Sequence, residues 1–182
     1  MKPLLSPFNV ISLLILSLGY GTFWLVTRPQ PLPDISGLND GGKRVSVKVQ
    51  LFYSDSQTTG FKPEDRQLEV REVEKGNLPQ LTLDALLEGS RNQGLALVPR
   101  NAEHPTVFPK AGHLFVDLPK SWTKLGYSSS GEMVLLCGIT RTLLSLSGYK
   151  DVTFMVGGKA ADTLLGSADL TSVYDTQSCD LP

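Results

Sequence analysis

Hydrophobic residues form one continuous stretch near the start of the chain. Residues 8–26, FNVISLLILSLGYGTFWLV, are 19 residues without a charged side chain. A helix of that length spans about 28 Å, close to the hydrocarbon thickness of a bilayer. The pattern therefore predicts a single transmembrane anchor in the lipid bilayer over 8–26, behind a short N-terminal tail of residues 1–7.

A cleaved signal peptide is the alternative to an anchor. Lys2 supplies the basic start of a signal peptide, but the apolar stretch ends near Trp24 without a small-x-small cleavage pattern. We favour the uncleaved anchor; a cleaved segment would leave the rest of the chain secreted. The positive-inside rule, with Lys2 and the amino terminus weighed against Arg28, places the following domain outside the cytoplasm, in the periplasm or on the outer face.

A spacer and one water-soluble domain follow the apolar stretch. Residues 27–42 contain three prolines and three glycines, which is typical of an extended linker. We call residues 43–182 the head. Its residues 43–174 are enough for one domain with its own core, and residues 175–182 form a C-terminal tail.

The periodicity of the head changes between that of strands and that of helices. Val45, Val47 and Val49 alternate with polar residues and predict a first strand over 44–53. Apolar residues at three- and four-residue steps predict a long helix over 130–148. A shorter helix is predicted over 77–89, and further strands over 66–74, 106–108, 114–118, 151–156 and 162–165. We expect an α+β fold, a two-layer mixed β-sheet with two helices packed on one face.

Three stretches of the head carry a family resemblance. They are VKVQLFYSD over 47–55, ALLEG followed downstream by HLFVDL over 85–118, and the block SSGEMVLLCGITRTLLSLSGYKDVTFMVGGK over 129–159. In this order and spacing they resemble the GerMN domain, a sporulation and spore-germination module. The chain departs from the family at Ser90, where proline is common, and at Gly157, where the turn often has an acidic residue.

The resemblance implies a ring-building-motif-like βαββαβ core, held outside the cytoplasm on a lipid or membrane anchor and acting in assembly. We therefore predict a membrane-anchored, extracytoplasmic protein-protein interaction or assembly module of the cell envelope. Its expected partner is an envelope protein or a second copy of the chain. Apolar and aromatic loop residues are the candidate partner contacts, and packing over the sheet or helix ends is the alternative for each: Phe61, Leu95, Leu97, Trp122 and Tyr127.

Charge and cysteine content limit the partners and the cross-links that can be expected. The chain has 17 basic and 18 acidic residues with the two signs mixed throughout, so nucleic acid is excluded as an expected partner. Cys137 and Cys179 could pair outside the cytoplasm. Cys137 also falls in the pattern of the long helix, where a free cysteine behaves as a small hydrophobe. The sequence leaves both possibilities open.

No group of residues predicts catalysis, a cofactor or a metal. His104 and His113 lack a second ligand at helical spacing, so a metal site would require Asp117 to approach them through folding. The run GYSSSG departs from the nucleophile elbow at Ser130, and helix capping explains its serines. Glu64 and Asp65 are expected in a solvated turn.

We therefore predict that the chain is not an enzyme and that it holds no cofactor or metal. The alternative is an envelope ligand-binding or peptidoglycan-acting enzyme head. That alternative requires a deep pocket lined by two or more carboxylates, or a metal.

Overall fold

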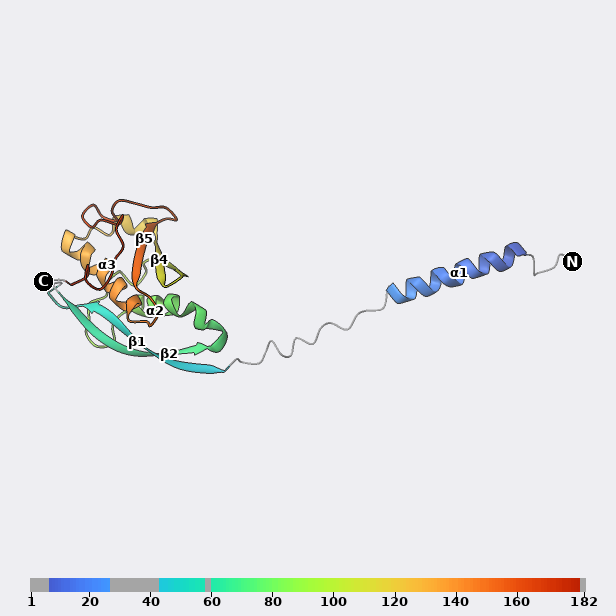
Figure 1. Cartoon of the computed structure of the whole chain (residues 1–182), viewed down its shortest axis with the longest axis horizontal. Coiled ribbons are helices and arrows are strands. Elements are labelled where there is room, and N and C mark those ends of the chain that lie inside the picture. The colour runs from blue at the N-terminus through green and yellow to red at the C-terminus, as the bar shows by residue number, and fades with distance from the viewer. Residues whose placement is uncertain (1–6, 27–42, 58–59, 181–182) are drawn as a thin grey trace. The chain divides into compact units, whose positions relative to one another are not determined.

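The computed structural model describes residues 7–26, 43–57 and 60–180 of the chain (Figure 1). Contacts divide the chain into two units, Met1–Gly41 and Gly42–Pro182. The predicted linker over 27–42 lies outside the described residues, as does most of the predicted tail over 1–7.

The apolar stretch forms one helix, α1 (Pro7–Val26). Within the described residues, no helix is both long and apolar enough to cross a membrane. The hydroxyls of Ser17 and Thr22 donate hydrogen bonds to carbonyl oxygens of their own helix at 2.9 and 3.0 Å. The helix is confirmed, whereas the transmembrane span predicted over 8–26 is not supported.

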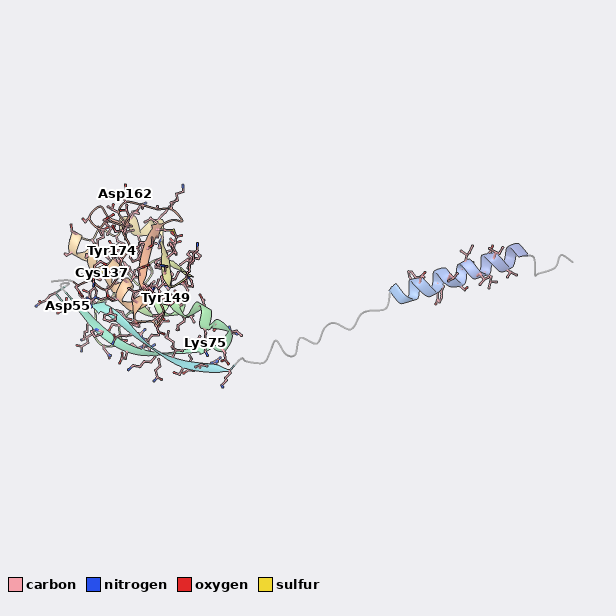
Figure 2. The ribbon with its side chains drawn as sticks, in the orientation of Figure 1. Asp55, Lys75, Cys137, Tyr149, Asp162 and Tyr174 are labelled. Atoms are coloured by element: carbon pink, nitrogen blue, oxygen red, sulfur yellow. A yellow bond between two sulfur atoms is a disulfide. The ribbon has the colours of Figure 1, made fainter. Side chains whose placement is uncertain are left out.

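The head begins with a long antiparallel hairpin. Strands β1 (Arg44–Ser54) and β2 (Phe61–Arg71) pair from Arg44 opposite Arg71 to Ser54 opposite Phe61. The alternation predicted for the first strand is confirmed, with Val49, Leu51 and Tyr53 buried on one face. The other face is exposed from Arg44 to Gln50 (Figure 2), whereas Phe52 is half-buried and Ser54 is buried. The second strand starts five residues before the predicted position 66.

A second sheet contains the remaining strands, in the order β3-β4-β5. β3 (Thr106–Lys110) and β4 (His113–Leu118) are antiparallel, and β4 and β5 (Asp151–Val156) are parallel. A parallel pair requires a crossover connection. Helix α3 (Ser129–Leu144), together with the short 3-10 helix η3 (Lys120–Lys124), provides it. The α+β class is confirmed, but the single mixed sheet is wrong because the strands form two sheets.

The two helices of the head pack against both sheets. α3 contacts β1 and β5, and α2 (Leu78–Leu87) contacts α3, β1 and β3. From Val134 to Leu143 every residue except Arg141 is buried. A helix that is buried all round requires cover on more than one side. The predicted packing of both helices on one face of one sheet is therefore wrong.

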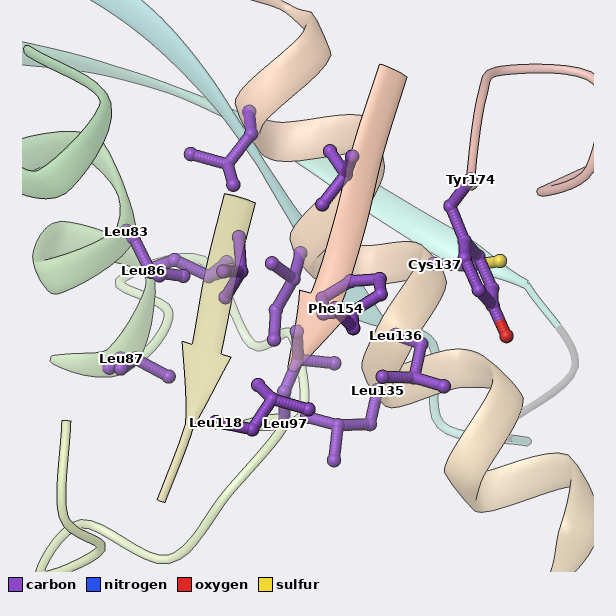
Figure 3. Close-up of a cluster of buried hydrophobic side chains, with 14 of the residues drawn as sticks. Leu83, Leu86, Leu87, Leu97, Leu118, Leu135, Leu136, Cys137, Phe154 and Tyr174 are labelled. Carbon is purple, nitrogen blue, oxygen red and sulfur yellow. The ribbon is translucent and has the colours of Figure 1, made fainter. Parts of the chain in front are cut away.

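The core lies where the helices meet the second sheet. Figure 3 shows Leu83 and Leu86 of α2, Leu118 of β4 and Phe154 of β5 directed toward one another, with Leu135 of α3 beside them. All five are at most 1% exposed. The short 3-10 helix η2 (Glu72–Asn77) connects β2 to α2.

The chain after β5 has no helix or strand among its described residues 157–180. Gly157 and Gly158 form the predicted turn with φ of 58° and 76°, but the strand predicted over 162–165 is absent. The backbone instead forms an isolated bridge between Tyr174 and Val152 of β5.

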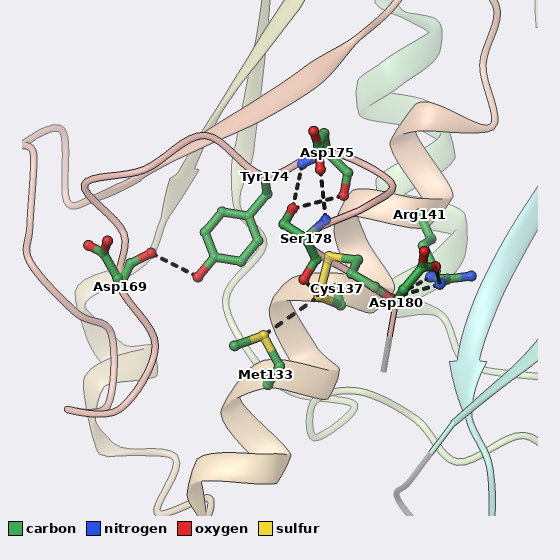
Figure 4. The surroundings of a disulfide bond; sticks show 9 residues. Met133, Cys137, Arg141, Asp169, Tyr174, Asp175, Ser178 and Asp180 are labelled. Atoms are coloured by element: carbon green, nitrogen blue, oxygen red, sulfur yellow. Dashed lines mark hydrogen bonds and ion pairs between the residues drawn. A yellow bond between two sulfur atoms is a disulfide. The ribbon is translucent and has the colours of Figure 1, made fainter. Parts of the chain in front are cut away.

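The two cysteines, which the sequence left open, form a disulfide (Figure 4). Cys137 belongs to α3 and Cys179 to the C-terminal segment, and both are fully buried. Arg141, one turn further along α3, donates two hydrogen bonds to the carbonyl oxygen of Cys179, at 3.0 and 2.7 Å. Within the described residues, the predicted C-terminal tail over 175–182 is thus fastened to the head at Cys179.

Candidate functional site

Three of the five predicted contact residues line one groove. Leu95, Leu97 and Tyr127 surround a space of about 180 Å³ between the end of β1 and the first turns of α3. We call it the Leu95 groove. Its lining is mostly apolar and consists of Ser54, Leu95, Ala96, Leu97, Tyr127, Gly131, Val134 and Leu135.

Backbone contacts hold the Leu95 loop in place. The N–H of Leu95 donates to the carbonyl oxygen of Ser54 at 2.9 Å, which attaches the loop to the end of β1. The Tyr127 hydroxyl donates to the carbonyl oxygen of Leu97 at 3.0 Å. A Cβ atom on Gly94 would lie 2.5 Å from the Cβ of Tyr53, so this approach requires glycine.

The side chains of the groove have different roles. Leu95 is 44% exposed, whereas Leu97 is 6% exposed and packs against the core. Tyr127 is half-buried, and burial raises the pKa of its hydroxyl above the usual value of 10.0. Leu95 is therefore the side chain of this set that is free to contact another molecule.

A buried ion pair lies beneath the loop that leads to the groove. Arg66 Nη2 and Glu64 Oε1 are 2.6 Å apart, and both side chains are at most 4% exposed. The guanidinium also donates to the carbonyl oxygens of Ala85 and Gly89 at the end of α2, at 2.7 and 2.9 Å. The expectation of a solvated turn at Glu64 is wrong, because Glu64 lies within β2 and faces inward.

The second carboxylate oxygen of Glu64 anchors the loop itself. Glu64 Oε2 accepts hydrogen bonds from Ser90 Oγ at 2.8 Å and from the N–H groups of Arg91 and Asn92 at 2.9 and 3.2 Å. Burial opposes ionisation, but hydrogen bonds from Arg66, Ser90 and Arg91 outweigh it and lower the pKa of Glu64. Glu64 thus links β2 to the segment that carries Leu95.

The other two predicted contact residues lie elsewhere. Phe61 is half-buried at the start of β2, edge-to-face with Phe52 at 6.4 Å between ring centroids and with the guanidinium of Arg141 5.2 Å from its own centroid. Trp122 is 1% exposed, and its Nε1 donates to the carbonyl oxygen of Glu103 at 2.9 Å. For Trp122 the packing alternative therefore describes the structure.

The two histidines and Asp117 do not come together as one metal site. His104 pairs with Asp84 at 3.0 Å, and His113 pairs with Asp151 at 2.7 Å. Asp117 accepts from the N–H of Gly158 at 2.7 Å. Among the residues described by the structure, no group of three histidine, cysteine or acidic side chains is placed to hold a metal ion.

Two polar grooves have the carboxylates required by the alternative function, and one of them, lined by Glu69, Asp84 and Glu88, lies between β2 and α2. In the other, Glu103 and Asp117 line a space of about 280 Å³, together with His104 and Lys120. Glu103 Oε2 accepts from Ser121 Oγ at 2.9 Å, and Asp117 is held by Gly158. Both acids therefore already serve local structure.

The serines before α3 act in helix capping, as predicted. The N-cap is Ser128, whose hydroxyl accepts from the N–H of Gly131 at 3.3 Å. Glu132 is fully buried and accepts from the N–H groups of Leu164, Leu165 and Ser167 at 3.2, 2.7 and 2.9 Å. It anchors the segment after β5, a role with no local sequence signal.

Comparisons with known proteins agree with this fold. The tandem GerMN domains of the sporulation protein GerM from Bacillus subtilis superpose with a TM-score of 0.56 at 17% identity, over 73% of this chain and 47% of that one. The first GerMN domain of the same protein gives 0.51 at 18% identity, over 69% and 94%. No curated protein sequence matches significantly. The family model for sporulation and spore germination, Germane, matches residues 50–162. The chain belongs to the Germane family of sporulation and spore germination domains.

Proposed function

We propose that the chain is a protein-binding or assembly module of the cell envelope that makes contact through the Leu95 groove. The observation that carries this proposal is the convergence of Leu95, Leu97 and Tyr127 on one apolar groove. Hydrogen bonds to Ser54 and from Tyr127 hold its rim, so little ordering is required on binding.

The occupant we propose is a protein partner that inserts an apolar side chain beside Leu95. A mostly apolar lining gives no charge for a nucleotide or sugar phosphate to pair with. Apolar and aromatic residues in a rigid surround are typical of the residues that dominate protein interfaces. A second copy of the chain and another envelope protein are the two forms of partner.

The disulfide supports a location outside the cytoplasm. Disulfides form and persist in oxidising compartments. The disulfide between Cys137 and Cys179 joins two positions 42 residues apart in the sequence. We include in the proposal that the apolar side chains of α1 attach the chain to the membrane, with the head extracytoplasmic. Alkaline extraction of membranes measures that attachment, and release of the full chain would argue against it.

Two matched charge substitutions test the groove. Leu95→Asp places a carboxylate at the groove, and Val73→Asp places one at another exposed apolar residue of the head, which is 84% exposed. Both variants of the full chain should keep the wild-type unfolding midpoint. We expect in-cell crosslinked complexes to be lost in Leu95→Asp and kept in Val73→Asp; equal recovery from both would contradict the proposal.

A further inference from the structure

Backbone groups at the outer edge of β2 are available for pairing. In an antiparallel ladder, alternate residues direct their N–H and C=O groups to opposite edges. Hydrogen bonds from Asp55 N to Gly60 O and from Glu72 N to Lys43 O, at the two ends of the hairpin, show which residues face inward. The odd-numbered residues of β2 from 61 to 71 therefore face away from β1.

The outer edge of β1 is occupied in its second half. The N–H of Phe52 donates to Thr142 Oγ1 at 2.9 Å, and the carbonyl oxygen of Gln50 accepts from Ser145 Oγ at 3.1 Å. Both partners belong to the C-terminal part of α3 and its cap. That edge of the hairpin is thus covered by the protein itself.

The outer edge of β2 is closed only at its ends. Pro63 has no N–H, and the N–H of Arg71 donates to Glu74 Oε2 at 3.4 Å. Between these two positions, in the part of the chain that the structure describes, three outward N–H groups have no hydrogen-bond partner in the protein: those of Asp65, Gln67 and Glu69.

A groove runs along this open stretch. Five consecutive residues of β2, 66–70, form one wall of a space of about 280 Å³. The other wall is one face of α2, made by Leu81, Asp84 and Ala85 with Glu88 one turn further, and Arg91 completes it. A groove between a strand edge and a helix is the setting in which extended peptides add a strand to a sheet. We call it the β2 edge groove.

Acidic groups prevail in this groove. Arg66 is 2.6 Å from Oε1 of buried Glu64 and 3.7 Å from Oε2 of Glu88, so two carboxylates share this one cation. The lining adds Glu69 and Asp84, the latter paired with His104, and one further cation, Arg91. The charge favours a segment that carries lysine or arginine.

We propose that the β2 edge groove binds an extended, basic segment of a partner protein by strand addition to β2. A second copy fits less well, because antiparallel pairing of two β2 strands about Gln67 would set Asp65 opposite Glu69 of the other copy. Like charges directly opposite one another destabilise a ladder. This surface is separate from the Leu95 groove, so either can fail without the other.

Amide hydrogen exchange on the full chain tests strand addition residue by residue. The probe is a synthetic hexapeptide of alternating lysine and valine, and the control is the same peptide with glutamate for lysine. In the free chain the amides of Gln67 and Glu69 should exchange quickly, while those of Arg66 and Leu68, which face β1, are protected. The lysine peptide should slow exchange at Gln67 and Glu69, and the glutamate peptide should not.

Three variants sharpen the test. Gln67→Pro removes an outward N–H without removing a hydrogen bond to β1. It should weaken binding of the lysine peptide at least about tenfold. Glu69→Lys should weaken binding of the lysine peptide about fivefold, and the difference from wild type should be smaller at high salt. Asp162→Lys is the matched control, an exposed acid away from the hairpin in Figure 2, and should change nothing.

Four results would overturn the proposal. They are absence of binding at millimolar peptide, protection at residues other than 65–69, equal binding of the glutamate peptide, and protection of 65–69 that rises with chain concentration alone. The last result would assign the groove to a second copy. If the lysine peptide binds the β2 edge groove but no complex depends on Leu95, only the proposed function is contradicted.

Discussion

The buried pair of Glu64 and Arg66 makes the sharpest prediction about stability. Glu64→Gln removes the charge but keeps the size of the side chain and one carbonyl oxygen. Removing one member of a buried ion pair costs about 3–5 kcal/mol, because the other charge stays buried. Arg66 would keep the carbonyl oxygens of Ala85 and Gly89 at 2.7 and 2.9 Å. We therefore expect the lower end, a loss of about 3 kcal/mol in the free energy of unfolding.

The pH dependence has a definite sign. The folded-state pKa of Glu64 lies below its ordinary 4.5, so the folded state binds fewer protons there than the unfolded state. Its contribution is fully present above about pH 5 and is lost as the pH falls through the folded-state pKa. Between about pH 5 and pH 3 the wild type should lose more stability than Glu64→Gln, because only the wild type has this carboxyl to protonate.

Urea unfolding followed by tryptophan fluorescence, in which buried Trp122 reports on the head, measures both effects. Asp65→Asn is the matched control, since Asp65 adjoins Glu64 but pairs with Lys48 at the surface, where both side chains are more than half exposed. That control should unfold almost as the wild type does. A loss below about 1 kcal/mol in Glu64→Gln, or equal pH slopes in variant and wild type, would refute the reasoning.

Three further predictions concern the packing around α3. Replacing both cysteines of the disulfide with serine should lower the free energy of unfolding by about 2–4 kcal/mol, and an unchanged urea midpoint would contradict this. Gly138→Ala should lower the free energy of unfolding by about 1–3 kcal/mol, because the added Cβ would lie 2.6 Å from a methyl carbon of Leu97. An unchanged urea midpoint would show that the Leu97 loop moves aside without cost. Glu132→Ala should speed amide exchange over 164–167, whereas wild-type exchange rates would show that other contacts hold this segment.

Periodicity was sufficient to predict most elements of the head. The alternation over 44–53 and the helical spacing over 130–148 correspond to β1 and α3, and the strand over 151–156 has the predicted limits. These signals are local, since each follows from which neighbours along the chain share a face. The family resemblance rests on the same stretches and is confirmed by the match over 50–162.

The layering could not be predicted because it depends on small and polar residues of α3. The sequence shows one leucine-rich stripe, but Gly138, Thr140 and Thr142 are buried as well. Their burial follows from the close approach of β1, where Phe52 donates to Thr142 and its carbonyl oxygen lies 3.2 Å from a Cβ placed on Gly138. Hydropathy alone does not distinguish such residues from a solvated face.

The candidate site was predicted in part. Leu95, Leu97 and Tyr127 were named as candidate contacts, and the structure places all three at one groove, although Leu97 is buried in the core. The buried ion pair of Glu64 and Arg66 beneath the groove was missed because charged residues are normally expected at the surface. Glu64 and Arg66 share the even-numbered positions of Leu68 and Val70 on β2, and that parity was the available signal.

A photocrosslinking amino acid at position 95 tests the central claim most directly. The full chain would carry it in living cells at Leu95, and in a matched variant at Val73, which is more exposed but lies outside the Leu95 groove. The account predicts a discrete protein adduct from position 95 that is absent from position 73 and is reduced by Gly138→Ala. Adducts of equal yield from both positions, or none from position 95, would contradict it.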